Sequence, residues 1–118
     1  MRAGFVHEAL IELVPDTDEA TPGAAVTAAL CGHWEHEGTC RWPHRTSIIG
    51  RSGPSLRVRV VFASPADEEP AVRQLISRAL GEGRLGDKPR FSHWTVVTQG
   101  QSELQPDEER LADHLLAI

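Results

Sequence analysis

The sequence of 118 residues predicts a single α+β domain, spanning residues 1–118. Several short segments alternate apolar and polar residues, which is typical of strands with one buried face. Between them lie segments whose apolar residues recur at helical spacing. The length fits one domain of common size and is too short for two. We therefore expect one sheet with helices packed on it.

The first part of the chain predicts a strand and then a helix. In residues 5–15 (FVHEALIELVP), apolar residues alternate with two glutamates, which is the period of a half-buried strand. Thr21 is a suitable N-cap, with Pro22 at the first helical position. The alanine-rich segment that follows predicts a short helix ending at Gly32.

Residues 43–50 (PHRTSIIG) and 55–64 (SLRVRVVFAS) predict the second and third strands, joined by a turn. The third strand has the clearest alternation in the chain. One face carries the apolar side chains of Leu56, Val58, Val60 and Phe62, and the other carries Arg57 and Arg59. We expect this strand to have one dry face and one wet face.

The last part of the chain predicts a helix, a strand and another helix. Residues 64–83 begin with Ser64 as a cap, carry acidic residues in the first turn and then show apolar residues at helical spacing. Residues 90–100 (RFSHWTVVTQG) predict the fourth strand, and Pro106 opens a final helix.

The predicted order is therefore β-α-β-β-α-β followed by a helix. This order predicts a ferredoxin-like sandwich, in which two helices cover one face of a four-stranded antiparallel sheet, with an added C-terminal helix. The second and fourth strands are then the edges of the sheet. Both carry few of the lysines and prolines that prevent edge pairing, so we expect a homodimer.

Composition limits the partners and the compartment. The net charge of -5 argues against nucleic acid and anionic membranes as partners, because both attract positive charge. No apolar segment approaches the roughly 20 residues of a membrane span, and we expect no signal peptide and a cytoplasmic location. Eleven arginines against one lysine suggest a GC-rich bacterial genome.

Residues 31–44 concentrate side chains that can bind a transition metal. The candidate ligands are Cys31, His33, His36, Cys40 and His44, which suffice for a tetrahedral zinc site. The alternative is a purely structural loop, in which Trp34 and Trp42 pack against the sheet. A disulfide between the two cysteines is a third possibility, although a cytosolic protein is expected to keep them reduced.

Two short motifs, His44-Arg45-Thr46-Ser47 and His93-Trp94-Thr95-Val96, repeat a histidine followed two positions later by a threonine. Residues two apart on a strand share a face, so each histidine would lie beside its threonine. The pair resembles the signature of the two-histidine phosphoesterases. This resemblance implies that His44 and His93 act as general base and general acid on a cyclic or 2′,5′-linked phosphate, with Thr46 and Thr95 binding its oxygens.

These predictions conflict in one respect. In a ferredoxin-like sheet the second and fourth strands lie three strand spacings apart, about 14 Å, which is too far for His44 and His93 to share one phosphate. Two classes of function therefore remain open. One is a binding or interaction protein with a metal-bound or aromatic-packed loop. The other is an enzyme, either the phosphoesterase or a metal-dependent enzyme in which the cluster of residues 31–44 keeps an open coordination position.

Overall fold

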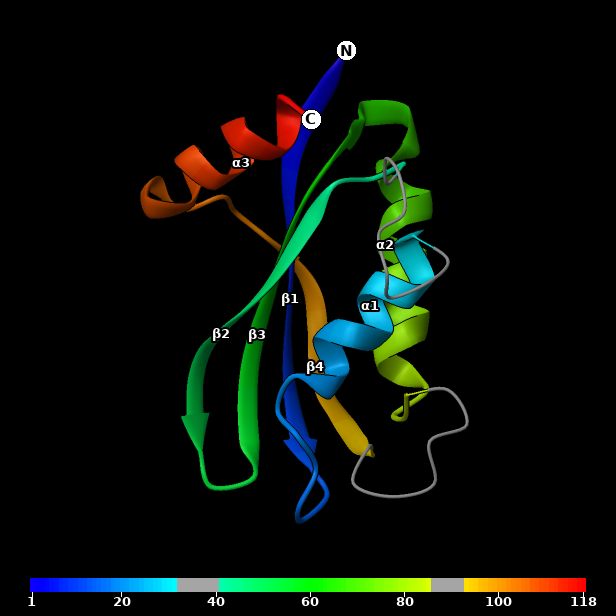
Figure 1. Cartoon of the computed structure of the whole chain (residues 1–118), viewed down its shortest axis with the longest axis vertical. Coiled ribbons are helices and arrows are strands. Elements are labelled where there is room, and N and C mark those ends of the chain that lie inside the picture. The colour runs from blue at the N-terminus through cyan, green and yellow to red at the C-terminus, as the bar shows by residue number, and fades with distance from the viewer. Residues whose placement is uncertain (32–40, 86–92) are drawn as a thin grey trace.

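The structure is a computed structural model that describes residues 1–31, 41–85 and 93–118. These residues form a four-stranded antiparallel sheet and three α-helices (Figure 1). The elements in chain order are β1 (Arg2–Leu13), α1 (Thr21–Cys31), β2 (His44–Ser52), β3 (Ser55–Pro65), the 3₁₀ turn η1 (Ala66–Glu68), α2 (Glu69–Gly81), β4 (Trp94–Ser102), the 3₁₀ turn η2 (Pro106–Glu108) and α3 (Glu109–Leu116). In this part of the chain, no helix is long and apolar enough to cross a membrane.

The strands lie in the order β2-β3-β1-β4, and every neighbouring pair is antiparallel. Strands β1 and β3 form the centre, and β2 and β4 are the two edges. Both edge strands contain an irregularity in their pairing, at Ile49 in β2 and at Val97 in β4. The predicted order of strands and helices agrees with this chain order.

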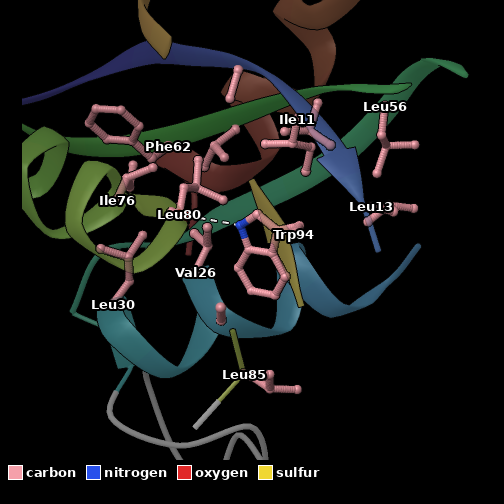
Figure 2. Packing of buried hydrophobic residues seen from close by; sticks show 14 of the residues in the cluster. Ile11, Leu13, Val26, Leu30, Leu56, Phe62, Ile76, Leu80, Leu85 and Trp94 are labelled. Atoms are coloured by element: carbon pink, nitrogen blue, oxygen red, sulfur yellow. Dashed lines mark hydrogen bonds between the residues drawn. The ribbon is translucent and has the colours of Figure 1, made fainter. Parts of the chain in front are cut away.

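The larger core lies between the sheet and the helices α1 and α2 (Figure 2). The alternating residues Leu56, Val58, Val60 and Phe62 of β3 are all buried in it, as their pattern predicted. The indole Nε1 of Trp94 donates a hydrogen bond to the backbone oxygen of Leu80 at 2.8 Å, which joins β4 to the end of α2. The indole N–H of Trp94 therefore has a hydrogen-bond partner although the side chain is buried.

The opposite face of the sheet is partly covered by α3 (Figure 1). A second, smaller core there consists of Val6, Val61, Ala63, Ala112 and Leu115. The prediction of a wet face on β3 was therefore wrong for the half of the strand that α3 covers. This half of the face is buried because α3 packs on it, and the residue pattern within β3 does not show that a distant helix will do so.

Arg59 lies on this face, and only 5% of it is exposed. Its guanidinium donates to both carboxylate oxygens of Glu108, at 2.8 and 2.7 Å, and to Glu8 at 3.3 Å. It also donates to the Ser102 hydroxyl and the Glu103 carbonyl. Because every partner is an acceptor, the buried positive charge is compensated, and η2 is held over β3.

Several predicted boundaries differ from the structure, including those at Ser64 and at the start of the fourth strand. Ser64 does not cap a helix: it is fully buried at the end of β3, and its hydroxyl donates to the Pro65 carbonyl at 3.0 Å. The strand continues to Pro65, and α2 begins only after η1. The fourth strand begins at Trp94, because His93 pairs with Arg84 in an isolated bridge instead.

Candidate functional site

A groove of about 410 Å³ lies between α1 and the edge strand β2. This volume is within the range of ligand-binding pockets. The groove is lined by Glu19, Ala20, Gly23, Thr27, His44, Arg45, Thr46, Ile48 and Val58. It contains two residues that the sequence predicted as functional, His44 and Thr46.

The wall formed by α1 follows from helical spacing. Gly23 and Thr27 are four residues apart and therefore lie on the same face of the helix. A Cβ atom on Gly23 would lie 3.3 Å from the Cβ of Thr46, so this glycine allows α1 to approach β2 closely. The wall formed by β2 presents His44, Thr46 and Ile48, which lie opposite buried residues of β3 and so share its helix-covered face.

His44 is held by contacts at both ring nitrogens. Nδ1 lies 3.1 Å from the carbonyl oxygen of Trp42, which can only accept, so this nitrogen carries the proton. Nε2 lies 3.1 Å from the hydroxyl of Thr27, which donates to it when the ring is neutral. The imidazole thus joins β2 to α1 at one end of the groove.

Thr46 differs from His44 in this respect. Its hydroxyl oxygen is buried and has no hydrogen-bond partner among the described residues. A buried hydroxyl without a partner is destabilising by about 1–3 kcal/mol. Because this oxygen is solvent-inaccessible, a ligand in the groove would hydrogen-bond to it only after rotation of the Thr46 side chain.

The structure does not bring His44 and His93 together. They are at the opposite edges of the sheet, about 14 Å apart across the strands. Along the strand direction, His44 is level with Phe5 of β1, because both lie opposite Phe62 of β3. His93 lies beyond the level of Leu13, which is about 26 Å further along β1. Two histidines at opposite corners of a sheet cannot contact one phosphate.

The two threonines of the motifs are also separated. Thr46 lies opposite Val60, whose side chain is in the core under α1 and α2. Thr95 lies opposite Glu12, on the other face of the sheet, and is exposed. The repeated motif therefore places its two halves on different strands and different faces.

The proposed metal cluster is only partly within the described residues, because His33, His36 and Cys40 lie outside them. Cys31 ends α1, and its sulfur is disulfide-bonded and lies 3.9 Å from Nδ1 of His44. The sequence predicted a reduced thiol at Cys31, whereas this sulfur is oxidised in the structure. Cys31 would have to be reduced before it could bind a metal. Within residues 1–31, 41–85 and 93–118 there is no group of metal ligands. The zinc site stays a prediction.

The structural interpretation of this loop expects Trp34 and Trp42 to pack against the sheet. Trp34 lies outside the described residues, and Trp42 is positioned as expected. Its half-buried ring packs against the main core, and its Nε1 donates to Glu68 at 2.8 Å. The guanidinium of Arg41 stacks over the same ring, 4.6 Å from its centre. These contacts fasten the chain before β2 to the turn that precedes α2.

Sequence patterns did not identify the helical half of the groove. Gly23 and Thr27 interrupt an alanine-rich helix at a spacing of four residues, and this was the available signal. Arg59 had no such signal, since its partners are distant in sequence.

Comparisons with known proteins add no family to this description. No family model matches the sequence, no curated protein sequence matches it, and no solved structure matches the fold.

Proposed function

We propose that this chain is a protein-interaction module in which an extended segment of a partner protein adds to the outer edge of β2. The observation that carries the proposal is the groove beside this edge, between β2 and α1. A partner strand would hydrogen-bond to the backbone of β2, and its side chains on the helix side would enter the groove. Backbone pairing supplies affinity in this mode, and the pocket supplies specificity.

The edge supports the backbone part of this proposal. No described strand pairs with the outer side of β2. Alternate N–H and C=O groups of such a strand point outward and can template another strand. Ile48 and Ile49 are 42% and 49% exposed on it, so a partner would also cover apolar surface.

The groove supports the side-chain part. Its base includes the buried Val58, and its walls include the side chains of Thr27 and Thr46. An apolar base with a few polar groups fits a partner side chain that is itself both apolar and hydrogen-bonding. Rotation of the Thr46 side chain would turn its unpartnered hydroxyl toward such a side chain, which would then bind in preference to a purely apolar one.

A peptide selection tests the proposal. Phage-displayed random peptides are selected on the wild-type protein, and one selected peptide is then titrated by calorimetry and by amide chemical shifts. We expect shifts in β2 and α1. Ala20→Trp, which fills the groove from an exposed position, should weaken binding by at least about tenfold, or 1.4 kcal/mol.

Ala117→Trp is the matched control, because Ala117 is also exposed but lies after α3, far from the groove in sequence and not among its lining residues. This variant should bind as the wild type does. Selected peptides that shift other elements, or that bind Ala20→Trp as tightly as the wild type, would show that the groove is not the binding site.

We also propose that the fold is ferredoxin-like. The chain order of its elements, the antiparallel strand order β2-β3-β1-β4 and the position of α1 and α2 on one face support this assignment. In this arrangement β2 and β4 are available for pairing with other chains.

A further inference from the structure

We infer that β4 is the interface of a homodimer, in which the β4 strands of two copies pair antiparallel to form one continuous eight-stranded sheet. This inference goes beyond the proposed function and does not depend on it. It rests on the composition of the edge, on its exposure and on the symmetry of the pairing.

The nine residues of β4, WTVVTQGQS, include no charged residue and no proline. Natural edge strands are usually protected from pairing by charges, especially lysine, or by proline. The residues present are mainly threonine, valine and glutamine, which suit an extended strand. At the start of β4 the outward N–H of Trp94 donates to the Gly83 carbonyl at 2.9 Å, but beyond this residue no described strand pairs with the outer side of β4.

Val97 adds exposed apolar surface in the middle of this edge. Val97 is the extra residue of the β4 bulge, because its neighbours Val96 and Thr98 pair with the adjacent residues Ile11 and Leu10 of β1. It is 50% exposed. A bulge can itself discourage pairing by twisting the edge. Here it also presents an apolar side chain that a second strand would cover.

A second copy fits this edge better than a charged partner does. In an antiparallel pair related by a two-fold axis at Thr98, the middle of the strand, every residue of β4 faces an uncharged residue of the other β4. No like-charge contact then opposes self-pairing. A foreign strand would find no charge on β4 with which to be recognised.

Strand β2 is less suited to self-pairing. It carries Arg45 and Arg51, and antiparallel pairing centred on Ile48 would place Arg45 opposite Arg51 of the second copy. Like charges directly opposite each other destabilise a strand pair. A dimer through β4 would leave both β2 edges, with their grooves, at the outer ends of the eight-stranded sheet.

Sedimentation velocity and light scattering on the full chain, over a range of protein concentrations, test the inference. We expect the wild type to have the mass of a dimer. Val97→Lys should place two positive charges close together at the interface and raise the dissociation constant by at least about a hundredfold. The far-UV circular dichroism spectrum of this variant should not change.

Ile49→Lys is the matched control, because Ile49 is also a bulge residue of an edge strand and is 49% exposed. It should remain a dimer. If Val97→Lys does not fold, Gln101→Lys, at an exposed position of the same edge, replaces it. A monomeric wild type, a dimeric Val97→Lys or a dissociated Ile49→Lys would each overturn the inference. Peptide binding at β2 is measured separately and can fail or succeed independently.

Discussion

At the scale of single residues, His7 is a buried ionisable group whose surroundings disfavour its charged form. The side chain is on the helix-covered face of β1, where Nε2 donates to Gln99 at 3.0 Å and Nδ1 has no partner in the described part of the chain. Burial lowers the pKa of His7 below its ordinary value of 6.5, and the positive charge of Arg73 lowers it further, although the hydrogen bond to Gln99 opposes both.

This shift predicts a pH dependence of stability. Between the lowered pKa and 6.5, the unfolded chain binds a proton at His7 that the folded chain does not bind. The stability that depends on a neutral His7 is therefore fully present above about pH 6.5, and the free energy of unfolding decreases as the pH falls through this window. We expect His7→Gln to remove this dependence in urea unfolding curves recorded between about pH 5 and 8.

His114→Gln serves as the control for the His7 prediction, because His114 is exposed on α3. Its unfolding free energy should follow the wild-type pH dependence. If His7→Gln and the wild type lose the same stability on acidification, His7 does not cause the dependence.

The pair formed by Arg59 and Glu108 gives a second prediction at this scale. Arg59 lowers the pKa of Glu108, chiefly by donating hydrogen bonds to its carboxylate. Glu108→Gln removes a negative charge from a buried arginine and should cost about 2–4 kcal/mol in the free energy of unfolding. Glu19→Gln breaks an ion pair with Arg51 of the same length, 2.7 Å, in which both side chains are 46% exposed.

The exposed pair should contribute less than about 1 kcal/mol. Chemical denaturation of both variants at neutral pH measures the two losses. Equal losses would mean that burial under α3 does not strengthen the contribution of Arg59.

At the scale of elements, the sequence was most informative where one strand or helix determines its own pattern. The alternation in β3 identified its core face. The spacing in α2 identified Val72, Ile76 and Leu80, which are fully buried, and also Leu75 and Ala79, which are only half-buried. Local patterns were less informative where distant elements compete. Ser64 looks like a helix cap, but pairing with β1 extends β3 through it.

The candidate site shows the same limit. His44 and Thr46 were found from their motif, and the structure places both in the groove. The motif could not show that His93 lies at the opposite corner of the sheet, because strand order and register depend on long-range pairing. Nor could it identify Gly23 and Thr27, whose role arises only when α1 packs beside β2.

At the scale of the whole molecule, stability is divided unequally between the two faces of the sheet. The main core joins β1, β3 and β4 to α1 and α2, whereas α3 contributes only Ala112 and Leu115 as buried residues. The Arg59 contacts hold η2, the turn before α3. At the other end of α3, Arg2 donates to the backbone oxygens of Leu116 and Ile118. We expect α3 to open without unfolding of the sheet.

Native-state hydrogen exchange can test this division with two substitutions. Ile76→Val destabilises the main core, which stays formed when α3 opens alone. It should therefore speed exchange in β1 and β3 by about twofold to tenfold, for a cost of 0.5–1.5 kcal/mol, and leave the α3 amides unchanged. Glu108→Gln should speed exchange in β1, β3 and α3. The reason is that the contact between Glu108 and Arg59 is lost both when α3 opens alone and when the whole molecule unfolds. If Ile76→Val accelerates α3 in step with β1 and β3, then the molecule opens as one cooperative unit, and α3 does not open separately.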